Sequence, residues 1–64
     1  MALSKEEKDA IVDALDKMAT ASMKLVIASI ESFTNWLEGA FEWIYRKIRH
    51  AIIDIWNWAK SYFS

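Results

Sequence analysis

The hydrophobic and polar residues of 40–63 (AFEWIYRKIRHAIIDIWNWAKSYF) repeat with the period of an α-helix. At 100° per residue the apolar side chains fall on one arc of roughly 160°, and most of the charged side chains fill the opposite side. Trp43 and Ile53 are large apolar residues that lie among these charges. The pattern predicts an amphipathic helix whose wide, aromatic face must be covered by another helix, a copy of itself or a membrane surface.

The first half of the chain shows the same period over a longer stretch. Ser4 and Glu7 have the spacing of a capping box, in which each side chain bonds the backbone N–H of the other residue at a helix start. Apolar and small residues then follow at intervals of three and four, at Ile11, Leu15, Met18, Ser22, Val26, Ile30, Phe33 and Leu37. We therefore predict a helical stretch over residues 4–38.

This first stretch contains two weak places. Residues 18–23 (MATASM) include small and β-branched side chains but no residue that breaks a helix outright. Thr34 and Asn35 can both serve as N-caps of a new helix. We expect the first stretch to be bent or interrupted near residue 20 or residue 34.

Gly39 is the strongest stop signal in the chain, because glycine readily adopts the left-handed conformation that follows a helix end. We therefore expect a second helical stretch over residues 40–63. The alternative is a single rod through Gly39, since a glycine inside a helix costs only about 1 kcal/mol.

The chain is short and apolar. It has 64 residues, 55 % of them hydrophobic and 14 % aromatic, with four Trp and no Cys or Pro. A core of this size gives little net stability, and no disulfide can add to it. We predict one all-α domain over residues 1–64, built as a helical hairpin or a small helical bundle. Because its apolar arcs exceed what a two-helix hairpin covers, we also expect a homo-oligomer or a bound partner.

The charges are unevenly distributed, although the net charge is only −1. Residues 1–16 carry five acids and two lysines, whereas residues 46–50 (RKIRH) are basic. This polarity suits antiparallel or head-to-tail pairing of helices. It lacks the broad basic face of a nucleic-acid binder, so we expect no nucleic-acid partner.

Neither a transmembrane span nor a signal peptide is evident in the sequence. The longest uncharged runs have six residues, whereas a span needs about 18. The N-terminus is acidic and polar, whereas a signal peptide is basic and then apolar. If the protein acts outside the cell, we expect it to be secreted without a leader.

Few residues have side chains suited to catalysis or metal binding, and each has a simpler role. His50 and Asp54 are four residues apart on one helix face, where a solvated ion pair explains them better than an oriented base or half a metal site. Asp9, Asp13 and Asp16 share a face, but calcium sites use loops with turn glycines. Without a nucleophile, a phosphate-binding loop or a ligand cluster, we predict no enzyme activity, no cofactor and no metal site.

Cationic and aromatic side chains occur together in the second stretch. Helices that lie in the headgroup region of a bilayer carry this combination, and so do packed helices with core aromatics and a solvated charged face. Trp43 lies among the charges, so we expect it to be exposed, with Arg46 and Lys47 able to lie over its ring. The residues predicted to contact a membrane or a protein partner are Trp43, Arg46, Lys47, Arg49, Trp56, Trp58, Lys60 and Tyr62.

Three short motifs in residues 39–64 resemble a known family. They are NWAKS at 57–61, the W-x-W at Trp56–Trp58 and GAFEWIYRKI at 39–48. They look like the Trp- and Lys-rich helices of leaderless bacteriocins of the aureocin type, which begin with an unprocessed Met. The resemblance implies a saposin-like fold of amphipathic helices. It also implies that the protein kills Gram-positive bacteria by disturbing their membrane.

The sequence therefore leaves two functions open. The first is a small membrane-active, bacteriocin-like protein whose C-terminal helix opens and lies in the bilayer interface. The second is a self-assembling structural or adaptor subunit, whose apolar arcs pack against copies of itself or against a larger helical partner. The density of Trp and the family resemblance favour the first function, and the net charge of −1 favours the second.

Overall fold

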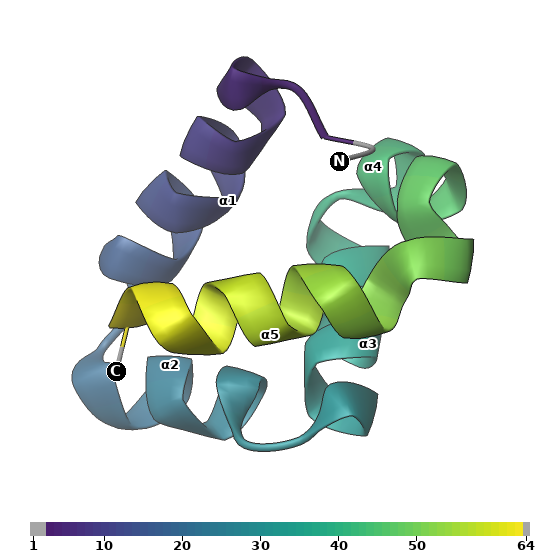
Figure 1. Ribbon diagram of the computed structural model, residues 1–64. Coiled ribbons are helices and arrows are strands. Elements are labelled where there is room, and N and C mark those ends of the chain that lie inside the picture. The colour runs from purple at the N-terminus through teal and green to yellow at the C-terminus, as the bar shows by residue number, and fades with distance from the viewer. Residues whose placement is uncertain (1–2, 64) are drawn as a thin grey trace.

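The computed structural model describes residues 3–63, and this part of the chain is helical nearly throughout. Short breaks separate the elements, which are α1 (Lys5–Asp16), α2 (Thr20–Ile27), α3 (Ile30–Ala40), α4 (Glu42–Ile48), the 3-10 helix η1 (Arg49–Ala51) and α5 (Ile52–Phe63). No strand occurs within residues 3–63. The predicted all-α class is confirmed, and short helices form a small bundle in place of a hairpin of two long ones (Figure 1).

Helix α1 begins with the predicted capping box. The Ser4 hydroxyl accepts a hydrogen bond from the Glu7 N–H at 3.2 Å, and the Glu7 carboxylate accepts one from the Ser4 N–H at 2.9 Å. The two bonds satisfy backbone donors that a helix start otherwise leaves without partners. The start of α1 could therefore be read from the sequence.

The first predicted stretch is broken twice, once near the expected place. The interruption expected near residue 20 is confirmed at residues 17–19. The interruption expected near residue 34 is wrong, because the second break lies at Ala28 and Ser29. Ser29 caps α3, with its hydroxyl accepting the Ser32 N–H at 3.1 Å. Thr34 lies inside α3 and donates its hydroxyl to the Ile30 carbonyl at 2.7 Å, a bond that a hydroxyl makes within a continuous helix.

The chain turns at Phe41 and not at Gly39. Gly39 lies inside α3, and no residue from 3 to 63 has a positive φ, so the expected left-handed glycine cap is wrong. The Phe41 N–H donates to the Leu37 carbonyl at 2.8 Å, and the Phe41 carbonyl accepts the Tyr45 N–H at 2.9 Å. The Phe41 ring also packs edge-on against Trp36, with the ring centroids 5.8 Å apart. This turn excludes the single rod, and aromatic packing rather than glycine marks its position.

The second predicted stretch is also divided, because η1 separates α4 from α5. A 3-10 turn has three residues per turn, so it changes the direction in which the following side chains point. Ile44 and Ile48 of α4 and Ile55 and Ala59 of α5 are all buried on the two sides of this turn. One continuous helix over 40–63 would have kept these side chains on a single straight face.

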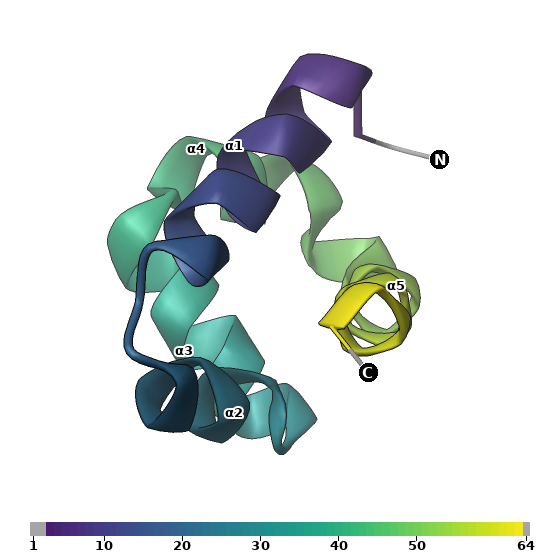
Figure 2. The same cartoon turned by 90° about the vertical axis from the view of Figure 1, so that its left-hand side faces the viewer.

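The core lies where the helices meet around α3, which packs against α2, α4 and α5. Figure 2 shows α5 end-on, with α1, α3 and α4 on the other side of the bundle. The buried hydrophobic residues are Leu3, Ile11, Leu15, Phe33, Leu37, Ile44, Ile48, Ile55 and Ala59. Except for Leu3, they all belong to the two apolar arcs that the helical period predicts. The bundle therefore covers the centres of both arcs within one chain.

Replacing Ile48 by Ala should lower the free energy of unfolding by about 2–5 kcal/mol, because the change leaves a cavity in the core. Ile53→Ala is the matched control, since Ile53 is 59 % exposed and lies on the polar side of α5. That control should change the free energy of unfolding by less than about 0.5 kcal/mol. Urea denaturation followed by circular dichroism measures both values. Equal losses at the two positions would show that the buried and exposed faces are assigned wrongly.

Candidate functional site

The residues predicted to contact a membrane or a partner divide into two groups by their contacts. In the first group, Lys47, Trp56 and Trp58 contact other helices of the bundle, and Lys60 contacts the Trp56 ring of its own helix. Members of the second group are exposed on the surface, and they are Trp43, Arg46, Arg49 and Tyr62. The structure thus spreads the predicted set over α4, η1 and α5 without gathering it into one site.

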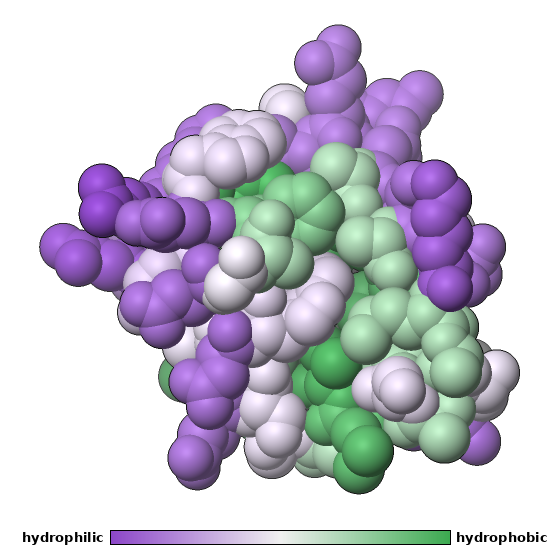
Figure 3. Space-filling model, turned by 180° about the vertical axis from the view of Figure 1, so that it is seen from behind, coloured by the Kyte–Doolittle hydropathy of each residue, from purple (hydrophilic) through white to green (hydrophobic). Residues whose placement is uncertain are grey.

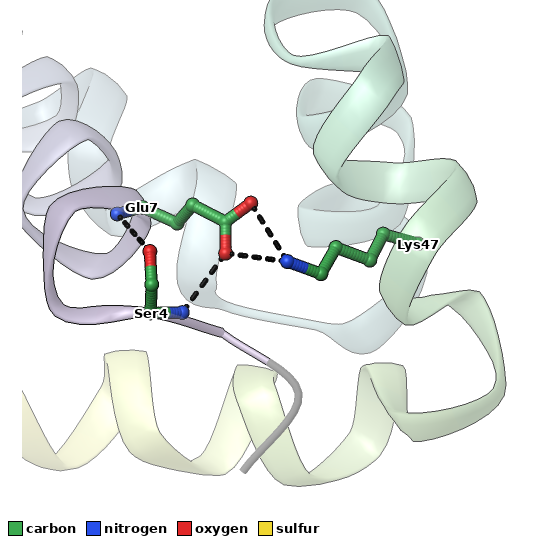
Figure 4. Close-up of polar contacts among 3 residues, drawn as sticks. All are labelled: Ser4, Glu7 and Lys47. Atoms are coloured by element: carbon green, nitrogen blue, oxygen red, sulfur yellow. Dashed lines mark hydrogen bonds and ion pairs between the residues drawn. The ribbon is translucent and has the colours of Figure 1, made fainter.

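Lys47 joins the N-terminus of α1 to α4. Its ammonium donates to both carboxylate oxygens of Glu7, at 2.9 and 3.2 Å, across a separation of 40 residues (Figure 4). Glu7 is only 7 % exposed, and its carboxylate also accepts the Ser4 N–H. The backbone hydrogen bond from Ser4 and the ammonium of Lys47 lower the pKa of Glu7 below its ordinary value. Lys47 therefore has a structural partner that periodicity alone could not show.

Trp56 joins α5 to α2. Its indole N–H donates to the carbonyl of Ile27, the last residue of α2, at 3.1 Å. This bond satisfies one of the carbonyls that a helix end leaves without a partner. The ammonium of Lys60 lies 3.6 Å from the centre of the Trp56 ring, close enough for a cation–π contact. Trp56 is thus half-buried, with its polar edge bonded and its face covered by a cation.

Trp58 lies on the side of α5 that meets α1. The Lys8 ammonium of α1 is 5.8 Å from the centre of its ring. The Tyr62 ring follows one turn later, with its centroid 6.3 Å from that of Trp58, and Phe63 packs edge-on against Tyr62. Tyr62 is 59 % exposed, so this aromatic group extends from the half-buried Trp58 to the surface.

Trp43 is 60 % exposed, which confirms the exposure expected from its position among charges. The cations expected over its ring have other partners, because Arg46 pairs with Glu42 at 2.7 Å and Lys47 pairs with Glu7. Glu42, Trp43 and Arg46 line a shallow depression of about 330 Å³. This depression is open to solvent on one short helix and brings no catalytic pair together.

The candidate chemical groups do not assemble into a site. His50 lies in η1 and Asp54 in α5, and the two form no ion pair, because the 3-10 turn removes the helical spacing that would align them. Within residues 3–63, no group of three or more His, Asp or Glu residues is arranged to hold a metal ion. Over the same residues, no helix has both the length and the hydropathy needed to cross a bilayer.

One exposed hydrophobic surface was not predicted from the sequence. Leu25 on α2 is 70 % exposed, more than any other large hydrophobic residue in the described part of the chain. The available signal was the charge pattern, since no acidic residue occurs between Asp16 and Glu31.

Comparisons with protein families, curated proteins and solved structures find no match to this chain. The function must therefore be argued from the surface of the bundle.

Replacing Glu7 by Gln should lower the melting temperature at neutral pH, because the amide loses its charge attraction to Lys47. Since the folded-state pKa of Glu7 is lowered, its contribution to stability is complete above the unfolded-state pKa of glutamate, about 4.3. That contribution is lost as the pH falls through the lower folded-state pKa. The difference in melting temperature between the wild type and Glu7→Gln should therefore shrink as the pH falls below the unfolded-state pKa and through the lowered folded-state pKa.

Thermal melts followed by circular dichroism at several pH values measure this difference. Glu6→Gln is the matched control, because Glu6 is an exposed neighbour on the same turn of α1. The control should leave the melting temperature close to that of the wild type at each pH. A Glu7→Gln effect that stays constant from neutral to acidic pH would contradict a stabilising role for the ionised carboxylate.

Proposed function

We propose that this protein is a small membrane-active helical protein, bacteriocin-like in its action, that binds the headgroup interface of anionic bilayers. The observation that carries the proposal is the position of the aromatic residues of α5 at the boundary between core and solvent. Trp56 and Trp58 are half-buried, and each has a lysine ammonium near its ring. Aromatic side chains with an apolar body, a polar edge and a neighbouring cation are typical of the bilayer interface.

The core limits how α5 can reach a membrane. Ile55 and Ala59 are buried, so α5 cannot lay its whole apolar arc in a bilayer while the bundle is intact. The exposed edge around Tyr62 can enter the headgroup region without unfolding. We therefore place adsorption of the folded bundle first. Opening of α5 is a later step, because it must break the core contacts and the Trp56 hydrogen bond to α2.

The acidic helix α1 opposes the opening step from within the bundle. It is attached to α4 by the ion pair between Glu7 and Lys47 and contributes Ile11 and Leu15 to the core. Its exposed acids are repelled by an anionic surface, and these acids are Glu6, Asp9, Asp13 and Asp16. An anionic bilayer would therefore favour separation of α1 from α5, which would release the aromatic arc.

The alternative function, a self-assembling structural or adaptor subunit, has lost part of its support. The argument for it was that two apolar arcs need a partner, and the centres of both arcs are covered within one chain. The exposed large hydrophobic residues that remain are spread over α2, α4 and α5, and they are Leu25, Trp43, Ile53 and Tyr62. Self-assembly is retained as an outcome of the experiment below.

The proposal predicts a blue shift of Trp emission when the protein is mixed with vesicles of phosphatidylglycerol and phosphatidylcholine. The apparent affinity should fall as salt rises, because cations near an anionic surface contribute about 1 kcal/mol each and salt screens them. Vesicles of phosphatidylcholine alone are the control and should give a smaller shift. Leakage of a trapped dye from the anionic vesicles should follow binding.

Unshifted emission with anionic vesicles at low salt would reject the membrane-active function. Analytical ultracentrifugation of the same samples without lipid then tests the alternative. A concentration-dependent dimer or larger species would support the self-assembling subunit in its place.

A further inference from the structure

Helix α2 carries apolar side chains on both its packed side and its exposed side. Met23, Val26 and Ile27 are half-buried against the core, and no residue of α2 is fully buried. On the other side, Ala21 and Leu25 are exposed. Figure 3 shows hydrophobic side chains gathered over the part of this face where α2 lies. This exposed side also carries polar side chains, but Leu25 is a large apolar side chain that the described part of the chain leaves mostly uncovered.

The charges around α2 indicate what covers it. Residues 18–30 contain a single charged side chain, the exposed Lys24, and no carboxylate. Exposed acids outnumber cations on α1 and α3, with Asp13 and Glu31 as examples. The α4 cations Arg46 and Lys47 are paired with Glu42 and Glu7. An anionic surface would therefore be repelled by α1 and α3 and attracted to α2.

We infer that the outer side of α2, with Leu25 and Lys24 at its centre, is the surface through which the folded bundle first binds an anionic lipid bilayer. Leu25 enters the acyl boundary while the Lys24 ammonium remains among the lipid phosphates. This inference rests on the proposed membrane function and names the face that performs it. The exposed edge of α5 around Tyr62 then enters the headgroup region after this first contact.

A second copy of the chain fits this surface less well than a bilayer. A two-fold contact centred on α2 would bring Lys24 of one copy close to Lys24 of the other. Eight residues at about 1.5 Å per residue make a helix roughly 12 Å long, whose single face falls well short of the roughly 800 Å² per partner in a stable protein interface. A bilayer has no such minimum area, because each apolar side chain that enters it adds to the binding.

The attachments of α2 allow it to bind without unfolding the core. It has no side-chain hydrogen bond at its N-cap, Ala19, and its C-terminal carbonyl at Ile27 is held by the indole of Trp56.

The test compares Leu25→Glu with Ile53→Glu on vesicles of phosphatidylglycerol and phosphatidylcholine. Both positions are exposed, so both variants should keep the circular dichroism spectrum of the wild type. Leu25→Glu should weaken vesicle binding by roughly tenfold or more, and Ile53→Glu should change it by less than about threefold. The double variant Arg46→Gln with Arg49→Gln should also stay within about threefold of the wild type, because it alters only the α4 and η1 side.

A second measurement does not depend on loss of binding. The chain has no Cys, so an environment-sensitive dye can be attached through Leu25→Cys or Ile53→Cys alone. The dye at position 25 should shift to the blue on anionic vesicles, and the dye at position 53 should not.

Each result separates the inference from the proposed function. In one outcome the wild type and Leu25→Glu bind vesicles, but the Arg46 and Arg49 variant does not. The assignment of the first contact to α2 is then wrong, and the membrane function stands. If the wild type does not bind vesicles at all, the membrane function itself fails. If Leu25→Glu instead abolishes a dimer seen without lipid, the occupant is a second copy and the inference is overturned.

Discussion

The burial of Phe33 and Leu37 is the interaction on which the rest of the bundle depends. Both side chains are fully buried on α3, the helix that packs against α2, α4 and α5. A chain of 64 residues has little net stability in reserve, so it cannot leave the faces that surround these side chains uncovered. A hairpin of two long helices would cover only one side of each of the two apolar arcs. The breaks at 17–19, 28–29 and 41 let short helices fold around α3 and cover both.

The helical period predicted which residues are buried, but not where the helices end. Burial follows from period because apolar side chains three and four residues apart face the same side whatever the exact boundaries. The helix boundaries are harder to predict, because several residues give similar capping signals. Ser29, Thr34 and Gly39 are all acceptable ends or starts, and tertiary contacts select among them. The edge-on packing of Phe41 against Trp36 is one such contact, and a single sequence does not reveal it.

The sequence predicted which types of side chain the candidate site contains, but it did not predict where they lie in the fold or what they contact. Composition identified the aromatic and cationic side chains, and exposure of Trp43 followed from its place among charges. The pairing of Lys47 with Glu7 spans 40 residues, so no local pattern could show that this cation is engaged within the fold. Leu25 was missed because the period places it beside the core face, and only the packing of α2 determines which side remains open.

The central claim is a closed bundle whose loosely held helix α2 meets the lipid first, and hydrogen exchange read residue by residue tests it most directly. In buffer, the amides of α3 should be the best protected and those of α2 among the least, because α2 buries no residue fully. On anionic vesicles, protection should rise at residues 20–27 and remain unchanged in α3. Protection that rises in α4 and α5 while α2 stays unchanged would contradict the account.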